Sequence, residues 1–272
     1  MISISKPGTH ISRNLVMIVA IVIIAFSCTK SNDTTTNKNG VKYCGTINWS
    51  ATDGRSGVFT GNTANGIYTP TDGKFTQNGI TGDIPLNYDS NGHLISDQPG
   101  VTYTYTQNYL SQINIDLQNG NGNGNYNFDS NGHLTRGVIN FTSQGFSGTM
   151  TGNYTYDSND DPVSFTATGT LSTPQGPVTL NIQITGDFLT DKSSLLPYLP
   201  IFAPVTSNFS FIPFLSKHLL NKWAITISGT GIATQNTTAQ YTYTYDANGN
   251  VSTMTRSDLS NVTYTFTYSN CK

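Results

Sequence analysis

The chain has 272 residues, only 10% of which are charged, and a formal net charge of −2. All 15 acidic residues are aspartate, a turn residue, and none is glutamate, a helix former, so the composition favours strands and turns over helices. The near-neutral charge, with no basic patch or acidic run, argues against a nucleic-acid partner. One turn sequence recurs along the chain, which favours a single large all-β domain at this length.

The beginning of the chain has the layout of an export signal. Lys6 and Arg13 precede an apolar run from Leu15 to Phe26, which is short for a membrane span. The run leads into Ala25-Phe26-Ser27-Cys28, which resembles the lipobox of bacterial lipoproteins. The resemblance implies that residues 1–27 are a leader cut by signal peptidase II and that Cys28 carries a lipid anchor. The alternative is an ordinary secretory signal with a chance cysteine.

Residues 28–42 are almost all polar and predict a flexible tether between the lipid and a domain at 43–272. A membrane, reached through the lipid anchor, is therefore a predicted partner. In some lipoproteins of Bacteroidota an acidic cluster after the cysteine directs export to the cell surface, whereas this tether has Lys30 and a single acidic residue, Asp33. We predict an outer-membrane lipoprotein, on either the periplasmic face or the cell surface.

Two further cysteines, Cys44 and Cys271, lie near the two ends of the predicted domain. In an oxidising envelope compartment they could form a disulfide, which would stabilise the fold by roughly 5 kcal/mol in the chain-entropy model. The alternative is two free thiols. If the cysteines pair, the first and last strands are neighbours, which favours a closed barrel.

A seven-residue phrase recurs in the domain, with an aromatic residue before Asp and with Asn and Gly in the following positions. Asp can accept a backbone N–H two residues on, and Gly can adopt φ > 0, so each copy predicts a β-hairpin bend. The third copy has Asp in place of the turn Gly. The copies are Tyr88 to Leu94, Phe128 to Leu134, Tyr156 to Pro162 and Tyr245 to Val251.

The rest of the domain alternates with period two, which predicts strands with an aromatic face and a threonine face. The clearest runs are Val101 to Thr106, Tyr241 to Tyr245 and Val262 to Tyr268. The Asn-Gly run at 119–124 is interpreted as a flexible connection. Further predicted strands are Ile47 to Ala51, Ile113 to Leu117, Gly137 to Thr142, Thr149 to Tyr156, Val163 to Leu171, Val178 to Thr185 and Trp223 to Ser228.

We count about a dozen or more strands, which is more than an open twisted sheet usually holds. The predicted fold is therefore all-β: a large antiparallel meander closed or nearly closed into a barrel.

The stretch 191–222 departs from this pattern because it is apolar and contains four prolines. Proline excludes a continuous helix or a central strand, so short helical turns packed against the sheet are predicted. One interpretation is a plug or lid that lines an apolar ligand cavity; the other is a connection that fills the core or caps one end. The candidate ligand-lining residues are Leu196, Tyr198, Phe202, Phe211, Phe214 and Trp223.

Two family resemblances rest on these motifs. The segment Tyr243 to Val251 resembles the YD repeat of Rhs-type proteins, whose repeats build large β-shells. Ser216-Lys217-His218-Leu219, followed by the Tyr245 to Val251 hairpin, is similar to a family of secreted Bacteroidota lipoproteins of unknown function with a porin-like fold. The second resemblance implies a barrel and gives no activity.

Motifs for catalysis or metal binding are missing from the sequence. Asp157, Asp160 and Asp161 are a weak candidate for a calcium loop, but a plain turn is the better interpretation because no Glu can complete the site. His93 and His133 occupy equivalent turn positions and are expected to be exposed. Neither a nucleophile elbow nor a phosphate-binding loop is present. The sequence thus predicts no metal, no cofactor and no enzymatic activity.

Three classes of function remain. The first is a tethered module that binds a glycan through aromatic residues such as Trp49, Tyr68 or Trp223, or an apolar molecule inside the barrel, although each aromatic residue singly is better explained as core. The second is a structural or adhesive envelope protein whose working surface is the threonine face. The third is a membrane-spanning β-barrel with its aromatic face toward lipid.

Overall fold

The computed structural model describes residues 44–64, 67–84, 86–90, 93–96, 100–106, 109–117, 120–143, 145–193, 218–258 and 261–271. The predicted leader, the tether with Cys28, and the candidate ligand-lining residues at positions 196–214 lie outside these ranges. No helix is present among the described residues, and therefore none there that could span a membrane.

The described chain forms a succession of strands joined by short connections. The strands are β1 (Cys44–Ala51), β2 (Ser56–Ala64), β3 (Ile67–Gln77), β4 (Ile80–Ile84), β5 (Asn87–Tyr88), β6 (Leu94–Ser96), β7 (Val101–Thr106), β8 (Tyr109–Leu117), β9 (Gly120–Phe128), β10 (Leu134–Ser143), β11 (Phe146–Tyr156), β12 (Pro162–Thr173), β13 (Gly176–Ser193), β14 (His218–Gly229), β15 (Ile232–Tyr245), β16 (Val251–Arg256) and β17 (Val262–Cys271).

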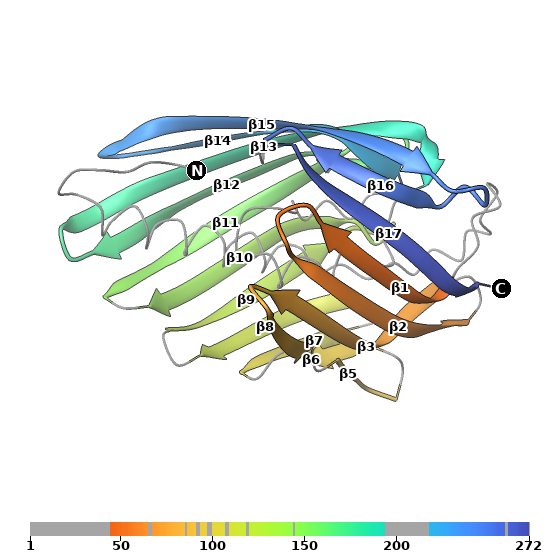
Figure 1. Cartoon of the computed structure of the whole chain (residues 1–272). Coiled ribbons are helices and arrows are strands. Elements are labelled where there is room, and N and C mark those ends of the chain that lie inside the picture. The colour runs from red at the N-terminus through yellow and green to blue at the C-terminus, as the bar shows by residue number, and fades with distance from the viewer. Residues whose placement is uncertain are drawn as a thin grey trace.

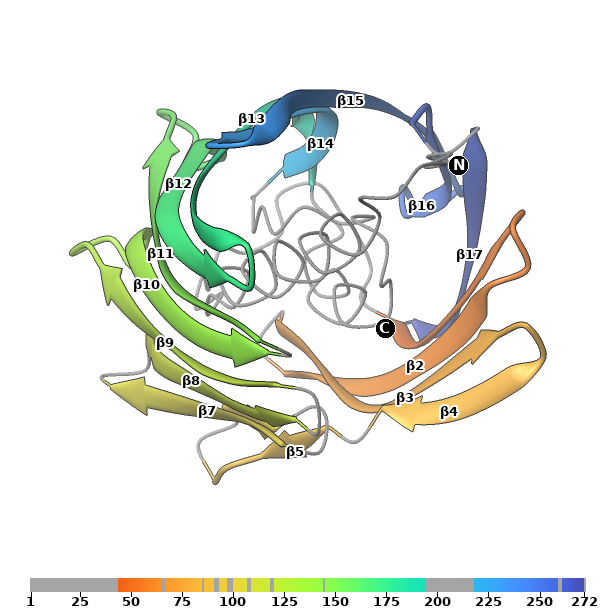
Figure 2. The ribbon, with the colours of Figure 1, turned by 90° about the vertical axis from the view of Figure 1, so that its left-hand side faces the viewer.

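Fifteen of these strands form one antiparallel sheet with the order β4-β3-β2-β1-β17-β16-β15-β14-β13-β12-β11-β10-β9-β8-β7. The sheet curls around an axis, as the view along that axis shows (Figures 1 and 2). The first and last strands are neighbours, because β1 pairs with β17. The predicted all-β antiparallel meander is confirmed.

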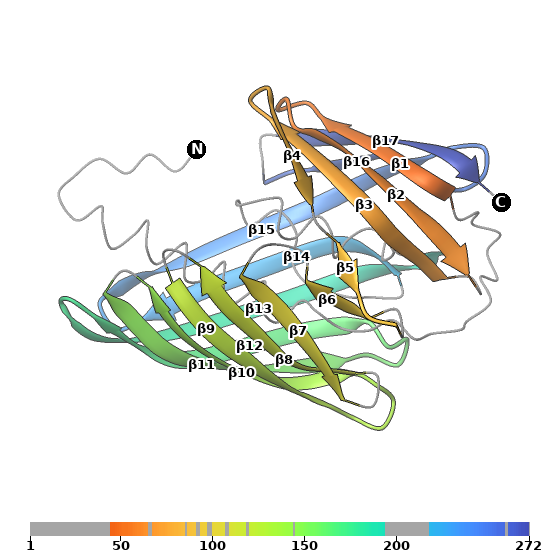
Figure 3. The same cartoon turned by 90° about the horizontal axis from the view of Figure 1, so that it is seen from below.

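A barrel closed or nearly closed was predicted, and the sheet is not closed, so closure is wrong. The two edges of the curled sheet are β4 and β7, and the separate hairpin of β5 and β6 lies between them (Figure 3). The opening therefore lies between β4 and β7 and not between the first and last strands, so the β1–β17 pairing does not close it. The residue after β4 is Pro85, which has no N–H to donate to another ladder.

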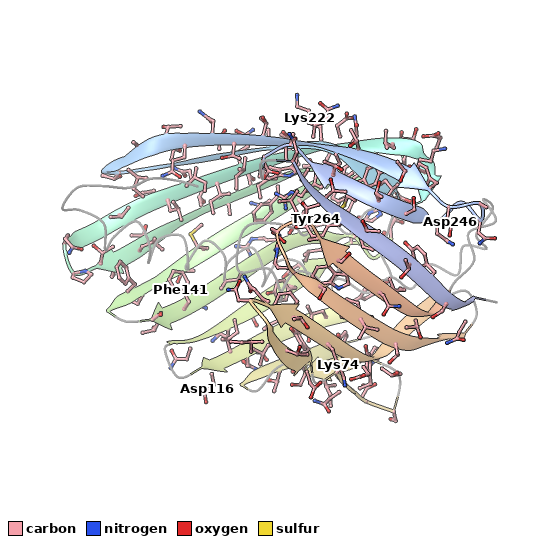
Figure 4. All side chains as sticks on the ribbon, viewed as in Figure 1. Lys74, Asp116, Phe141, Lys222, Asp246 and Tyr264 are labelled. Carbon is pink, nitrogen blue, oxygen red and sulfur yellow. The ribbon has the colours of Figure 1, made fainter. Side chains whose placement is uncertain are left out.

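The two faces of the curled sheet differ in composition. Along β7, Val101 and Tyr103 are buried while Thr102 and Thr104 are exposed, and the other strands alternate similarly. No described strand lies over the outside of the curled sheet in Figure 2, so the buried aromatic and aliphatic face is the inner one. Lys222 and Asp116 project from the outside (Figure 4).

The Asn-Gly run at 119–124 is not the flexible connection that the sequence predicted, because β9 begins at Gly120. In this strand the asparagines lie on the outer face and the glycines on the inner face. Gly122 is the register partner of Phe141, and Phe141 also pairs with Gly148 on the other side. Large inner side chains thus lie beside glycines, so a strand of low β propensity fits the sheet.

No helical insertion is seen in the described part of 191–222, so that prediction is not supported there. Its two ends are strand instead: β13 continues to Ser193, and β14 begins at His218. Phe188 and Leu189 pair with Leu220 and Leu219, which continues the period-two pattern past the predicted boundaries. Residues 194–217, with all four prolines, lie outside the described chain.

Candidate functional site

The recurring phrase forms hairpin bends, as predicted. In the second copy, the Asp129 carboxylate accepts the backbone N–H groups of Asn131 (2.8 Å) and His133 (2.9 Å), and Gly132 has φ of 84°. The same pattern recurs at Asp246, which accepts the N–H groups of Asn248 and Asn250. These turns follow β9, β11 and β15, so in an up-and-down meander they share one end of the curled sheet, where Figure 4 labels Asp246.

Tyrosines from neighbouring strands hold two of these turns, those after β9 and β15. The Tyr156 hydroxyl donates to the carbonyl of Leu134 (3.2 Å), and the Tyr268 hydroxyl donates to the carbonyl of Val251 (2.7 Å). Each carbonyl belongs to the residue that resumes the strand after the turn. The phrase therefore recurs because each copy builds the same hairpin end, which is a structural role.

His93 and His133 are packed, so the expectation that they are exposed is wrong. The ring of His93 stacks on Tyr105 with centroids 4.5 Å apart, and the ring of His133 stacks on Tyr156 at 4.4 Å. The Nδ1 atom of each histidine lies within hydrogen-bond distance of the Oδ2 atom of the Asp in its own turn. The distance is 2.9 Å for His93 and 3.0 Å for His133. Equivalent positions in the phrase thus have equivalent packing.

The third copy ties β14 to the turn between β11 and β12. Asp161 is fully buried, and its Oδ2 atom lies 2.6 Å from Nδ1 of His218. Burial raises the pKa of Asp161, while its hydrogen bond with His218 acts in the opposite direction. Asp160 replaces the turn glycine at φ of 63°. Within the described ranges no group of His, Cys and Asp side chains could hold a metal ion, and Asp157 serves as the turn acceptor.

Asp246→Ala is expected to lower the free energy of unfolding by about 1–2 kcal/mol near neutral pH, because two backbone N–H groups lose a partly solvent-screened acceptor. Burial alone would raise the pKa of Asp246, but hydrogen bonds from Asn250 and Asn248 lower it. A carboxylate with a lowered pKa stabilises the fold above its unfolded-state value of about 3.9, and this stabilisation is lost as pH falls through the folded value.

Urea unfolding at about pH 7 and about pH 2.5 measures both effects, and the difference between the parent and Asp246→Ala should shrink in acid. Asp83→Ala, an exposed position on β4, is the control and should change stability by less than about 0.5 kcal/mol. A loss at Asp246 no larger than at Asp83 would contradict the assigned role of the turn carboxylates.

Two arginines lie on the inner face, opposite the Asp turns along the strands. Arg256 is fully buried, contacts Asp258 through Nε (3.0 Å) and Nη2 (2.5 Å), and lies over the ring of Tyr241. Arg55 donates from Nη2 to the Tyr264 hydroxyl at 2.8 Å. Burial raises the pKa of Tyr241 to about 12, so it remains a neutral phenol. The network joins the β1–β2 and β16–β17 turns to the core.

The aromatic residues proposed as ligand platforms belong to this core where they are described. Trp49 is 3% exposed and Trp223 is 2% exposed. The indole N–H of Trp223 donates to the Tyr241 hydroxyl at 3.1 Å. The side chain of Tyr68 lies outside the described part of the structure. The inner aromatic face therefore offers neither tryptophan as an exposed stacking surface for a sugar.

The outer face instead presents uncharged polar side chains in rows that cross the strands. One row crosses β7 to β13 in register, and we call it the amide row: Thr102, Asn114, Asn123, Asn140, Thr149, Thr170 and Thr179. A second row crosses β15 to β4, and we call it the hydroxyl row: Thr244, Thr253, Thr265, Ser50, Ser56, Thr76 and Thr81. Neighbours in a row lie roughly 4.8 Å apart, the spacing of strands.

A shallow open depression of about 610 Å³ lies along part of the amide row. The depression lies on the outer face of the sheet, over β8 to β11. Its lining residues are Asn114, Ile115, Asn121, Gly122, Asn123, Asn140, Phe141, Thr142, Ser147, Gly148 and Thr149. Sequence analysis identified the threonine face but missed that Asn121 and Asn123 lie on it, because their run was interpreted as a connection.

No protein-family model matches this sequence, and no curated protein matches it. Among solved structures, a porin-like protein from Bacteroides vulgatus ATCC 8482 has a TM-score of 0.39 and 12% identity, covering 84% of this chain and 98% of that chain. A porin-like protein from Bacteroides uniformis ATCC 8492 has a TM-score of 0.34 and 14% identity, with the same coverage of both chains.

A third similar structure is the TcdB2-TccC3-Cdc42 complex, with a TM-score of 0.38 and 10% identity, covering 79% of this chain and 10% of that chain. Two of the structures named here are porin-like proteins from Bacteroides.

Proposed function

We propose that this chain is a lipid-anchored protein of a bacterial outer membrane that binds an uncharged ligand through the outer face of its curled sheet, without catalysis. The observation that carries this proposal is the exposed set of threonine and asparagine rows on that face. Large exposed apolar residues are scarce among the described side chains: Ile80, Ile95 and Tyr245.

This distribution opposes the membrane-spanning alternative. A transmembrane barrel places an apolar band toward lipid and polar residues toward its lumen. Here Tyr264 and Phe266 are buried on the inner face, while Thr265 between them is exposed. An apolar ligand would have to enter the inner face, whereas a hydroxyl-rich ligand suits the outer one. A glycan is therefore the favoured ligand class.

The anchor is supported by the apolar run before Cys28 and by the polar residues that follow it. Cys28→Ser is expected to abolish incorporation of radiolabelled palmitate and to move the protein from the membrane fraction to the soluble fraction. Ser27→Ala, which keeps a small residue before the cysteine, is the matched control and should leave both unchanged. Labelling that persists in Cys28→Ser would contradict the anchor.

Binding can be tested by sedimenting the purified protein with insoluble, uncharged polysaccharides. The proposal predicts saturable sedimentation that survives high salt, because the outer rows carry no charge and salt screens only charged contacts. Failure to sediment with any polymer, together with self-association that rises with protein concentration, would favour the structural or adhesive alternative.

A further inference from the structure

Three neighbouring side chains of the amide row are fixed relative to one another. Asn140 donates from Nδ2 to Oδ1 of Asn123 at 3.0 Å, and the Thr149 hydroxyl donates to Oδ1 of Asn140 at 2.6 Å. Each amide carries two N–H donors and an oxygen with two lone pairs, so these bonds use only part of its capacity. The row therefore presents oriented donors and acceptors to the outside.

The depression follows the same residues. Asn114, Asn123, Asn140 and Thr149, which belong to four consecutive strands, all line it. A second register line beside them, Asn121 to Thr142 to Ser147, forms its other side. Because strands lie roughly 4.8 Å apart, the depression runs about 15 Å across β8 to β11. That length accommodates an extended oligomer rather than a single small molecule.

The charges around the depression decide the class of ligand. None of the residues that line it is charged. The register partner of Asn121 on β8 is Asp116, whose exposed carboxylate would repel an acidic polymer. Recognition of phosphate or carboxylate groups normally uses Arg or Lys. Sugar hydroxyl groups donate and accept hydrogen bonds, and asparagine amides and threonine hydroxyls do the same.

We infer that the depression binds a neutral glycan chain that lies across β8 to β11, with Asn123, Asn140 and Thr149 as its main hydrogen-bonding residues. This inference rests on the proposed function and adds the place on the outer face and the residues that bind the glycan. The hydroxyl row lies on the same outer face with the same strand spacing, and its Ser56, Thr76 and Thr253 are half-buried. It lacks amides, and so it is the matched control surface.

The test uses the full-length protein in mild detergent, with dextran, a soluble β-glucan and a mannan as neutral probes and polygalacturonate as the acidic probe. Affinity gel electrophoresis and calorimetry measure the association constants. Binding of at least one neutral probe is expected, and Asn123→Ala or Asn140→Ala should lower its association constant about tenfold, the effect of losing hydrogen bonds to the ligand. Thr253→Ala and Thr265→Ala in the hydroxyl row should leave it within about twofold.

Asn140→Asp covers the case in which an alanine variant fails to fold, because it preserves the side-chain shape and adds a charge; it should also weaken binding. Equal losses from the hydroxyl row would overturn the assigned place while leaving the proposed function standing. Sedimentation with insoluble polymers but no binding of any soluble neutral probe would overturn this inference alone. A preference for polygalacturonate would overturn both the neutral class inferred here and the uncharged ligand of the proposed function. The absence of both sedimentation and probe binding would overturn the proposed function as well.

Discussion

Cys44→Ser is expected to lower the free energy of unfolding by roughly 5 kcal/mol under oxidising conditions, because a Cys44–Cys271 disulfide would close nearly the whole domain into one loop. The two residues are register partners in the β1–β17 ladder. Register partners in antiparallel strands have Cα atoms about 4.5 or 5.5 Å apart, and both separations suit a disulfide. The ladder therefore supports the pairing that the sequence left open.

Denaturant unfolding of the parent, Cys44→Ser, Cys271→Ser and the double variant measures this effect. The three variants should be equally destabilised, since either single change removes the bond, and a reductant should affect only the parent. Mass spectrometry after alkylation of the unfolded, unreduced parent should find neither cysteine modified. Two alkylated cysteines, or losses that add in the double variant, would contradict the disulfide.

Asp258→Ala is expected to destabilise the protein by about 3–5 kcal/mol, because it leaves the Arg256 guanidinium charged, buried and without its carboxylate. Arg256 is fully buried, and its Nη1 atom has no hydrogen-bond partner in the described structure. Arg256→Met, which removes the charge and keeps an apolar stem, should cost much less. Urea unfolding curves compare the two.

Asp116→Ala is the control for this comparison, since it removes an exposed aspartate from the outer face and should change stability by less than about 0.5 kcal/mol. The order of stabilities is the decisive result. If Arg256→Met is as damaging as Asp258→Ala, the guanidinium itself holds the β16–β17 turn in place, and the explanation from an uncompensated buried charge is wrong.

The strands and hairpin bends could be predicted from the sequence because their signals are local. Period-two alternation located every major strand from 134 to 185, and the Asp-Asn-Gly turns occur where the phrase recurs. The prediction for the Asn-Gly run was wrong because Asn and Gly have low β propensity, which disfavours a strand there. What decides that strand is non-local: Phe141 of the neighbouring strand pairs with Gly122.

Closure of the barrel could not be read from the sequence for a similar reason. The number of strands indicates that a sheet must curl, but it does not say which edges remain unpaired. The opening depends on the short β5–β6 hairpin, which leaves the main sheet after β4. The amide row also escaped prediction, because it is defined by the register of seven strands rather than by neighbours in the chain.

The buried arginines were likewise missed. Nothing in the local sequence distinguishes Arg256 from an exposed strand residue, although its position alternates in phase with Met254, which is buried. This alternation with Met254 was the one sequence signal that could have predicted the burial of Arg256. The partners that make burial tolerable, Asp258 and Tyr241, come from a turn and from the adjacent strand.

The central claim is that the polar face of the curled sheet faces outward and the aromatic face is the core. The behaviour in water of the chain from residue 29 onward, without leader or anchor, tests it most directly, by analytical ultracentrifugation in the absence of detergent. The account predicts a soluble, monodisperse species with a cooperative unfolding transition. A chain that aggregates in water and becomes monodisperse only in detergent would show that the aromatic face meets lipid, and would contradict both the orientation of the sheet and the binding surface proposed from it.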